Sequence, residues 1–485
     1  MIDSTKQTIF FRADGDSVIG LGHIVRSSAM AAYLKGHYKC ILLTRCVIAS
    51  VLEEVSYIFD QIISLPVVDY YSEAHNFSDF KSKNSLVVLD GYFFDSRYQE
   101  ILTGAGYKFF FIDDIHAFKY YANAIINQSG NIKPLDYNAL PGTQFYLGPL
   151  YSLLRKPFLD AAKEKRNAVD NRNCFICFGG ADPENKTLEI LRKNKIRNNF
   201  DHFHIVVGSA YKYLNELEDF ATGTKKITIH TSASAKEMVV IMKQCSYAIC
   251  SPSSVVYEYM SIGGAVFLEQ TANNQQSTLN YMVEERLAFH LKDIENIRNT
   301  DILQSHERQA IYFDGQSGER ILKIFNQYFT SQKLTFRKAT INDLQRCFDW
   351  ANDSDVRQQS YNQNQIKLDD HTAWFNNKIT DPQSFFYIIE MDQQPVAQIR
   401  FEIKNNEAIL GYLADKSIRN QGLGTAILSE GIEQFIQDVQ KPVHITAYVK
   451  STNIASQRSF ERLAFQKKES TEYPNSFKYI MSHGN

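Results

Sequence analysis

Over the first 330 residues, short apolar runs alternate with stretches of helical periodicity, and this alternation constrains the fold more than any other feature. It is typical of a mostly parallel sheet covered by helices. The first series of expected strands comprises Thr8–Arg12, Cys40–Thr44, Leu86–Asp90, Phe109–Asp113 and Ala124–Asn127. A second series comprises Cys174–Phe178, His204–Val207, Ile227–His230, Tyr247–Cys250 and Ala265–Leu268. We therefore expect an α/β fold with two Rossmann-like halves, over residues 1–157 and 158–330, and a cleft between them.

The pattern changes near Ser331. Leu334–Arg337 is expected to be a strand, and Thr340–Asn352 a helix. Two further strands, Val396–Ile403 and Ala408–Leu413, are separated by only a short turn. This α+β pattern predicts a third domain over residues 333–485, and a length of 485 residues agrees with about three domains.

Charge and composition exclude several classes of protein. The 52 Lys and Arg residues nearly balance 54 Asp and Glu, whereas a general nucleic-acid binder usually has a basic excess. No apolar run approaches the roughly 18 residues of a membrane span, and Met1–Lys6 does not begin a signal peptide. The seven dispersed cysteines suggest a reduced, cytoplasmic protein. The Cys174–Cys177 pair lies in an apolar strand that points the two side chains to opposite faces, so we expect no metal there.

A glycine-rich loop, Gly20–Arg26, follows the first expected strand. Gly20 and Gly22 let the backbone turn sharply and approach a ligand closely. His23 then falls in the first turn of the next helix, where the helix dipole disfavours protonated imidazole and so suits a general base. The residues alone fit a tight turn with an incidental capping histidine equally well.

The second half contains three segments that suit a nucleotide diphosphate. Gly179 and Gly180 follow a strand and make room for phosphate oxygens, although a purely structural turn has the same pattern. Ser253 and Ser254 stand at an expected helix start, where their hydroxyls either cap the helix or donate to a diphosphate. Glu258, one turn further on, is placed to accept from both ribose hydroxyls; the alternative is a solvated helix residue.

The third of these segments follows the strand that ends at Leu268. Asn274 and Gln275 lie one helix and one strand beyond Glu258, so all three are expected on the rim formed by the carboxyl ends of the strands. The doubled asparagine leaves a one-residue ambiguity with Asn273.

Several motifs in order resemble one family. They are Phe11–Arg26, Leu89–Tyr92, Ile112–Asp114, Asn127–Gln128 and Leu147–Arg155. Over roughly residues 7–330 the chain resembles the UDP-2,4-diacetamido-2,4,6-trideoxy-β-L-altropyranose hydrolases of pseudaminic acid synthesis, which have a glycosyltransferase-B-like fold. The resemblance implies that His23 is the catalytic base, that Tyr92 shares the catalytic site and that the second half binds UDP. It also implies that Gly20, Gly22 and Arg26 contact the substrate.

The third domain has a loop that suits a pyrophosphate. Ile418–Ala426 has the spacing Arg-x-x-Gly-x-Gly at a helix start, which makes a cradle of backbone N–H groups. This loop and Asn453–Phe465 together resemble the acetyl-CoA-binding segments of the GNAT acetyltransferases. The residues implied to bind acetyl-CoA are Arg419, Gln421, Gly422, Gly424, Thr425, Asn453 and Ser456. Phe460 stands where many members have a tyrosine that protonates the coenzyme thiolate, and phenylalanine has no proton to donate.

Glu402 is the candidate base for the acetyl acceptor. Side chains alternate along Gln398–Ile403, which places Glu402 on one face with Gln398 and Arg400. The alternative is a polar sheet face in solvent. His371–Phe375 resembles the acceptor-side helix of amino-sugar N-acetyltransferases.

The motifs together predict a bifunctional enzyme that acetylates a UDP-4-amino-sugar from acetyl-CoA and hydrolyses the resulting UDP-sugar, without a metal. Two alternatives remain: a glycosyltransferase that uses the same cleft, and a UDP-sugar-binding protein with a degenerate acetyltransferase.

Overall fold

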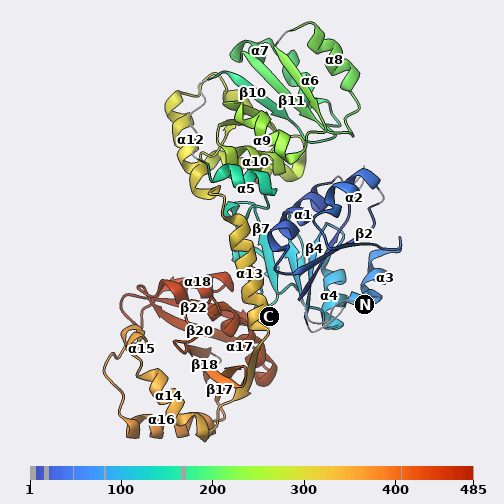
Figure 1. Cartoon of the computed structure of the whole chain (residues 1–485). Helices are drawn as coiled ribbons and strands as arrows, with labels where there is room; N and C mark the ends of the chain where they lie inside the picture. Colours follow the sequence, from blue (N-terminus) through green and yellow to red (C-terminus); the bar gives the residue numbers. More distant parts are fainter. Residues whose placement is uncertain are drawn as a thin grey trace.

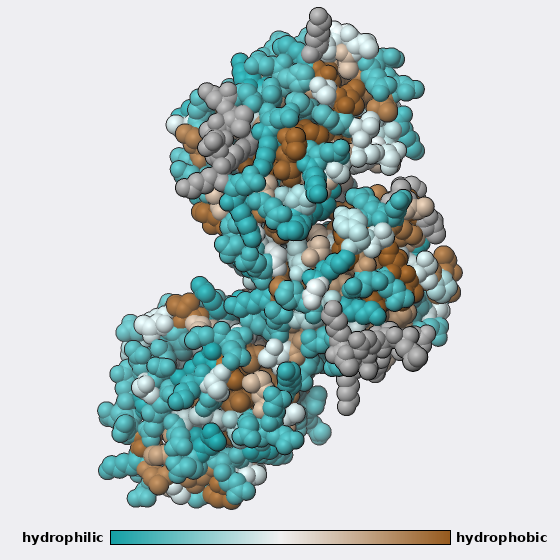
Figure 2. Space-filling model, viewed as in Figure 1, coloured by the Kyte–Doolittle hydropathy of each residue, from teal (hydrophilic) through white to brown (hydrophobic). Residues whose placement is uncertain are grey.

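The computed structural model describes residues 7–15, 21–46, 48–80, 84–164, 171–224, 226–405 and 407–483. Figure 1 shows three lobes, each built on its own sheet, with helix α13 (Ser317–Ser331) running between them. Figure 2 shows a mostly hydrophilic surface on this face, with small, separate hydrophobic areas.

The first sheet has seven parallel strands in the order β3-β2-β1-β4-β5-β7-β9. Its strands are β1 (Thr8–Ala13), β2 (Lys39–Thr44), β3 (Gln61–Ser64), β4 (Ser85–Asp90), β5 (Phe109–Ile112), β7 (Ala124–Asn127) and β9 (Gln144–Leu147). The helices are α1 (Gly22–Leu34), α2 (Ala49–Ser56), α3 (Tyr70–His75) and α4 (Ser96–Gly104), with 3-10 turns at Phe77–Phe80, Pro134–Asp136 and Pro149–Tyr151. A two-stranded ribbon pairs β6 (Lys119–Tyr120) with β8 (Asn138–Ala139). The central strands are buried on both faces, which explains their uninterrupted apolar runs.

The second sheet has six parallel strands in the order β12-β11-β10-β13-β14-β15. Its strands are β10 (Asn173–Cys177), β11 (His202–Val207), β12 (Ile227–Thr231), β13 (Tyr247–Cys250), β14 (Ala265–Leu268) and β15 (Phe289–His290). Its helices are α5 (Lys156–Ala162), α6 (Lys186–Arg192), α7 (Asn194–Asn199), α8 (Leu214–Thr222), α9 (Ala235–Lys243), α10 (Ser254–Ile262), α11 (Gln276–Glu284) and α12 (Asn299–Tyr312), with 3-10 turns at Asn273–Gln275 and Leu291–Asp293. All ten strands expected over the first 330 residues are confirmed to within two residues at each end.

The third sheet has the order β16-β17-β18-β19-β20-β22-β21, in which only β19 and β20 pair in parallel. Its strands are β16 (Leu334–Lys338), β17 (Ser384–Met391), β18 (Gln394–Lys404), β19 (Glu407–Ala414), β20 (Val443–Lys450), β21 (Gln466–Glu469) and β22 (Ser476–His483). Its helices are α14 (Leu344–Ala351), α15 (Ser354–Gln359), α16 (Leu368–Thr380), α17 (Gly424–Val439) and α18 (Ile454–Arg462), with a 3-10 turn at Ile341–Asp343.

Two helices cross the expected boundaries. Helix α5 begins at Lys156 and packs on α9 and α10 of the second sheet. Helix α13 packs instead on α1, and its buried Ile321, Phe325 and Phe329 belong to the core of the first sheet. Residues 317–331 therefore extend the first half rather than the second. An apolar stripe shows that a helix has a buried face, but it does not show which sheet covers that face.

The third lobe packs against the first half through α17 and α18. The Ser429 hydroxyl of α17 donates to the carbonyl oxygen of Gly142 at 2.7 Å. In the same interface, burial and the neighbouring Glu433 raise the pKa of Glu430 to about 7, although Lys108 and Ser331 oppose the shift. Burial also raises the pKa of Glu433.

Glu430→Gln is expected to stabilise the protein at alkaline pH. An acid with a raised pKa binds its proton more tightly in the folded state, so the stability it contributes near pH 5.5 declines as pH rises through 7. Glutamine removes that loss, and a gain of about 1 kcal/mol raises the Tm by about 2–4 °C. Thermal unfolding at pH 5.5 and pH 8 measures the difference, with exposed Glu469→Gln as the control. An equal Tm change at both pH values contradicts a titrating Glu430.

Candidate active sites

The first turn of α1 places His23 against the last residue of β4, Asp90. Nδ1 of His23 lies 2.7 Å from Oδ1 of Asp90, and His23 is 5% exposed while Asp90 is fully buried. Because the carboxylate accepts from Nδ1–H, Nε2 is the ring nitrogen left to take up a proton. The arrangement is that of a general base held in one orientation by a carboxylate. Sequence reasoning identified His23 but did not assign this role to Asp90.

Arg26 lies one turn further along α1 and binds two carboxylates. Its Nε and Nη2 donate to Asp90 at 2.8 and 2.6 Å, and its Nη1 donates to Asp114 at 2.7 Å. Burial alone would raise the pKa of Asp90, but Arg26 and His23 together hold it below its ordinary value. Asp90 therefore stays ionised near neutral pH. The structure thus engages Arg26, expected as a substrate contact, in positioning the His23–Asp90 pair.

Tyr92 covers the exposed side of the pair. Its ring meets the His23 ring edge-on at 4.8 Å between centroids, and its hydroxyl donates to Asp114 at 3.2 Å. Burial and, to a lesser extent, Asp114 raise the pKa of Tyr92 to about 12, so the hydroxyl remains a proton donor. Gly22 has open space where a Cβ would be, and Gly20 lies outside the described residues.

The base of the glycine loop is fixed by a buried ion cluster. The Arg12 guanidinium, with 0% exposure, donates to both carboxylate oxygens of Asp14 and of Glu73. Arg45 also donates to Glu73. Asp14 and Glu73 are 59 residues apart in the chain, so no local pattern indicates that they share a partner.

In the second half, the glycine pair is held by a neighbouring loop. Gly179 has φ +92°, which favours glycine. A Cβ on Gly208 would lie 2.8 Å from Cα of Gly180, so the two backbones need this close approach. Asp182 then caps α6 by accepting from the backbone nitrogens of its first two residues. Pro183 therefore lies before the helix, which begins at Lys186.

The N-terminus of α10 carries Ser253 and Ser254, as expected. The Ser253 hydroxyl lies 3.0 Å from the Ser251 hydroxyl and does not cap the helix, and Ser254 is exposed. The first N–H groups of this helix therefore remain available to a phosphate oxygen.

Glu258 of α10 is buried, so it is not a solvated helix residue. Nε and Nη2 of Arg155 donate to its two carboxylate oxygens at 2.7 and 2.9 Å. Arg155 ends the Leu147–Arg155 motif, but nothing in the local pattern indicated its partner 103 residues away. Any ribose contact of Glu258 must therefore share these oxygens with Arg155.

Gln275 stabilises its own loop. Its Oε1 accepts from the backbone nitrogen of Thr271 at 2.9 Å and from the Thr271 hydroxyl at 3.2 Å. Asn274 belongs to the 3-10 turn Asn273–Gln275, and its side chain lies outside the described residues.

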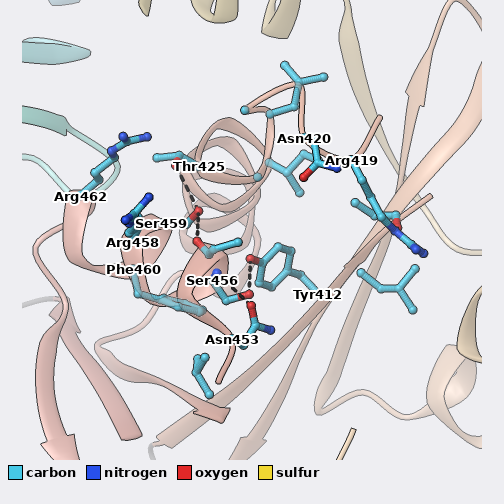
Figure 3. Close-up of a pocket in the computed structure, with 18 of the residues that line it drawn as sticks. Tyr412, Arg419, Asn420, Thr425, Asn453, Ser456, Arg458, Ser459, Phe460 and Arg462 are labelled. Carbon is cyan, nitrogen blue, oxygen red and sulfur yellow. Dashed lines mark hydrogen bonds between the residues drawn. The ribbon is translucent and has the colours of Figure 1, made fainter. Parts of the chain in front are cut away.

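The third lobe contains a cavity of about 830 Å³ where two parallel strands separate. β19 and β20 pair only over Glu407–Ile409 and His444–Thr446, and the next residues of both strands line the cavity. Unpaired backbone on two diverging strands can bind an extended ligand between them. The loop before α17 forms another wall (Figure 3).

One of the two glycines in that loop has the positive φ that lets backbone N–H groups converge on an anion. Gly422 has φ +77°, whereas Gly424 has no positive φ. Arg419 donates to Asp353 at 2.8 Å and to Asp355 at 3.0 Å. Its guanidinium is therefore shared with these carboxylates and is not reserved for a phosphate. Gln421 donates to a backbone carbonyl within the loop.

Helix α18 brings the remaining expected residues to the same cavity. The Asn453 side chain caps α18 by accepting from the backbone nitrogen of Ser456 at 3.1 Å. The Thr425 and Ser459 hydroxyls lie 3.3 Å apart, and Ser456 lies 2.9 Å from the Tyr412 hydroxyl (Figure 3). The cavity thus brings together six of the seven residues expected around the coenzyme, and Gln421 is the one that does not line it.

Glu402 is tied into an ion cluster outside this cavity. Lys378 donates to it at 2.8 Å and Arg400 at 3.2 Å. Although burial alone would raise the pKa of Glu402, these two cations hold it below its ordinary value. A carboxylate with a lowered pKa is a weak proton acceptor, and Glu402 is not among the residues that line the cavity. The alternation along the strand predicts that Glu402 and Arg400 share one face of the sheet. It does not predict Lys378, which comes from α16.

The described residues contain no group of three or more His, Cys, Asp or Glu side chains arranged to hold a metal ion. Within the same residues, no helix has the length and apolar character needed to cross a membrane.

Comparison with known proteins shows that two parts of the chain are similar to different proteins. Residues 333–466 match the model of the Acetyltransferase (GNAT) domain. The UDP-2,4-diacetamido-2,4,6-trideoxy-beta-L-altropyranose hydrolase of Campylobacter jejuni is 25% identical over 284 residues, covering 57% of this chain and 96% of the relative.

A Methanocaldococcus jannaschii protein of unassigned function is 22% identical over 384 residues, covering 75% of this chain and 77% of the relative. Among solved structures, an aminoglycoside acetyltransferase with coenzyme A shares 17% identity, covers 31% of this chain and 94% of that chain, and has a TM-score of 0.28. A Vibrio cholerae spermidine N-acetyltransferase with coenzyme A and spermine shares 13% identity, covers 31% and 95%, and has the same TM-score.

Three quarters of 485 residues exceeds the 332 residues before the matched domain, so the similarity to the archaeal protein extends into the C-terminal lobe. The expected resemblance is confirmed: the chain joins a segment similar to a UDP-sugar hydrolase to a GNAT acetyltransferase domain.

Proposed function

We propose that the chain is a bifunctional nucleotide-sugar enzyme of pseudaminic acid synthesis. Its GNAT domain acetylates the 4-amino group of a UDP-4-amino-sugar, and its N-terminal part then hydrolyses UDP-2,4-diacetamido-2,4,6-trideoxy-β-L-altropyranose. The observation that carries the hydrolase assignment is the His23–Asp90 pair, in a chain segment similar to a hydrolase of that substrate. All seven cysteines are buried and none of them forms a disulfide, which fits a reducing cytoplasm.

In the proposed hydrolysis, Nε2 of His23 takes a proton from water as the water oxygen attacks the anomeric carbon. The bond from that carbon to the UDP oxygen breaks, and the electron pair leaves with the diphosphate. Asp90 stabilises the imidazolium that forms, as in other carboxylate–histidine pairs. The Tyr92 hydroxyl stays protonated and donates to Asp114, which leaves its oxygen to accept a hydrogen bond from the sugar.

The two Rossmann-like halves form a glycosyltransferase-B-like arrangement in this proposal. The second half binds UDP through Gly179, Gly180, Ser253 and Ser254, with the uncapped start of α10 facing the diphosphate. Asn274 and Gln275 complete the rim.

For the acetyl transfer, the donor is acetyl-CoA. The amine nitrogen attacks the thioester carbonyl and loses a proton, the carbon–sulfur bond breaks, and the departing thiolate takes up a proton, so that no net proton is released. The loop Arg419–Thr425 and the start of α18 hold the pyrophosphate in the cavity. Phe460, 1% exposed, has no proton to give, but Tyr412 brings a buried hydroxyl into the same cavity. Glu402 has a lowered pKa, is paired with Lys378 and Arg400 and lies outside this cavity, so it is not assigned as the base.

Incubation of the purified protein with the UDP-diacetamido-sugar and no acceptor tests the hydrolase proposal. Free UDP and free sugar in equal amounts support hydrolysis. UDP release that requires an added acceptor indicates a glycosyltransferase, and no turnover indicates a binding protein. Transfer from radiolabelled acetyl-CoA to the UDP-4-amino-sugar tests the second activity separately.

Glu258→Ala is expected to weaken UDP binding about tenfold or more. The substitution removes the proposed ribose acceptor and leaves Arg155 without its carboxylate partner. Isothermal titration with UDP measures the affinity, and thermal unfolding shows whether the variant remains folded. Glu284→Ala, an exposed glutamate at the end of α11, is the matched control. Unchanged affinity in Glu258→Ala places the nucleotide elsewhere.

A further inference from the structure

The cavity of the acetyltransferase lobe is not closed by that lobe alone. Six of its lining residues precede residue 332 and belong to β9, the following 3-10 turn and α13: Tyr146, Tyr151, Arg320, Lys323, Ile324 and Gln327. One wall of the cavity therefore belongs to the hydrolase-like part of the chain.

The contact between this wall and the coenzyme loop is close. The Gln327 side chain donates to the carbonyl oxygen of Gln421 at 3.5 Å. A Cβ built on Gly422 would lie only 1.6 Å from Nε2 of Gln327. Lys323 lies four residues before Gln327, so both side chains share one face of α13. That face is therefore adjacent to the start of α17.

The cavity is strongly basic. Six basic side chains line it, Arg320, Lys323, Arg419, Lys450, Arg458 and Arg462, against one acidic side chain, Asp355. Arg320 pairs with Asp314 and Arg419 with Asp353 and Asp355, while Lys450 donates to backbone carbonyls.

Three cations remain without a carboxylate partner among the described residues: Lys323, Arg458 and Arg462. Arg458 and Arg462 are four residues apart on α18, and Figure 3 places both on the side of α17 opposite Arg419. The Arg462 guanidinium also lies 5.6 Å from the centre of the Tyr146 ring, which ties α18 to the first half. The unpaired cations thus come from both sides of the boundary between the two parts of the chain.

The linear structure of acetyl-CoA indicates which group these cations meet. The acetyl end must reach the diverging strands β19 and β20, and the pyrophosphate occupies the loop before α17. The phosphorylated adenosine then projects towards the remaining wall, formed by α13, α18 and the end of β9. A phosphomonoester carries about two negative charges near neutral pH, which suits a cluster of unpaired cations.

We propose that Lys323 of the hydrolase-like part, together with Arg458 and Arg462, binds the ribose 3′-phosphate of acetyl-CoA. This inference rests on the proposed acetyltransferase function and extends it, because the coenzyme site then spans both parts of the chain. The full acetyl-CoA affinity requires the first half and α13 to be in place.

The test compares two ligands in the full-length protein: acetyl-CoA and 3′-dephospho-acetyl-CoA, each titrated calorimetrically. Lys323→Glu is expected to weaken acetyl-CoA binding about tenfold or more, which corresponds to at least about 1.4 kcal/mol. It is expected to change the affinity for the dephospho ligand much less. Lys333→Glu, an exposed lysine beyond the end of α13 that does not line the cavity, is the matched control.

Unchanged binding in Lys323→Glu, or an equal loss for both ligands, overturns the assignment of Lys323 to the 3′-phosphate. Unchanged Tm and unchanged UDP release in the variant show that a loss is not caused by unfolding. If the wild type binds neither ligand, the proposed acetyltransferase function fails, and this inference fails with it. If the wild type binds both ligands equally, the acetyltransferase function stands and only the phosphate site is refuted.

Discussion

His23→Ala is expected to lower the rate of UDP release about 10²–10⁴-fold, the usual contribution of a general base, while acetyl transfer is unchanged. Asp90 fixes the imidazole through Nδ1, so the other ring nitrogen has no role in holding the fold together. The GNAT domain contains its own sheet and does not use this histidine. Coupled detection of UDP and, in parallel, transfer from labelled acetyl-CoA measure the two activities on one preparation.

A control for this prediction lies at the other end of α1. His37 is exposed just beyond the helix, and His37→Ala is expected to leave both rates unchanged. Asp90→Asn is a second probe, because an amide no longer selects the Nδ1–H tautomer and a large loss of hydrolysis is expected. Near wild-type hydrolysis in His23→Ala refutes its assignment as the base.

The sequence could predict His23 because its signal is local. A buried strand, glycines and a helix start lie close together in the sequence and define the turn. The structure confirms the strand, β1, and the helix, α1, which begins at Gly22. The partner is another matter: Asp90 is 67 residues away. It meets His23 only because β1 and β4 are neighbours in the sheet. Strand order depends on packing across the whole half, and local sequence patterns do not reveal it.

The same distinction explains the residues whose environment differed from expectation. The sequence predicts that Arg26, Glu258 and Glu402 each contact a substrate. In the structure each is paired, and the partner of Glu258 lies 103 residues away. Charge pairs between distant segments leave no periodic trace in the sequence, whereas strands and helices do. The packing of α13 on the first sheet is also a contact between distant segments, so the sequence pattern does not predict it.

Helix α13 lies where the two parts of the chain meet. Helix α13 packs one face on α1, the helix that begins with His23, and presents Lys323 and Gln327 to the cavity of the acetyltransferase lobe. One helix therefore supports both candidate sites. Substitutions on its cavity-facing side are expected to affect the coenzyme, and those on its buried side to affect the stability of the first half.

Gly422→Val is expected to lower acetyl transfer about 10²-fold or more and to leave UDP release intact. Gly422 has φ +77°, a conformation that costs an L-residue about 1–2 kcal/mol and a β-branched residue more. Relief of that strain moves the loop whose N–H groups are proposed to bind the pyrophosphate, and each charge-assisted hydrogen bond lost costs about 1.5–3 kcal/mol. Calorimetric titration with acetyl-CoA and the two activity assays measure the outcome.

Gly424→Val tests lost space alone in the same loop, whereas Gly422→Val combines a positive φ with a Cβ only 1.6 Å from Nε2 of Gln327. Gly424 has no positive φ, so a side chain at this position introduces no left-handed backbone strain. Its Cβ would make only ordinary contact, 3.6 Å from the Ser459 hydroxyl, so any loss must come from the volume that the valine takes from the ligand. We expect a smaller loss than in Gly422→Val. Normal acetyl transfer by both variants would falsify the assignment of this loop to acetyl-CoA, and the chain would then be left with one proposed activity, the hydrolysis at His23.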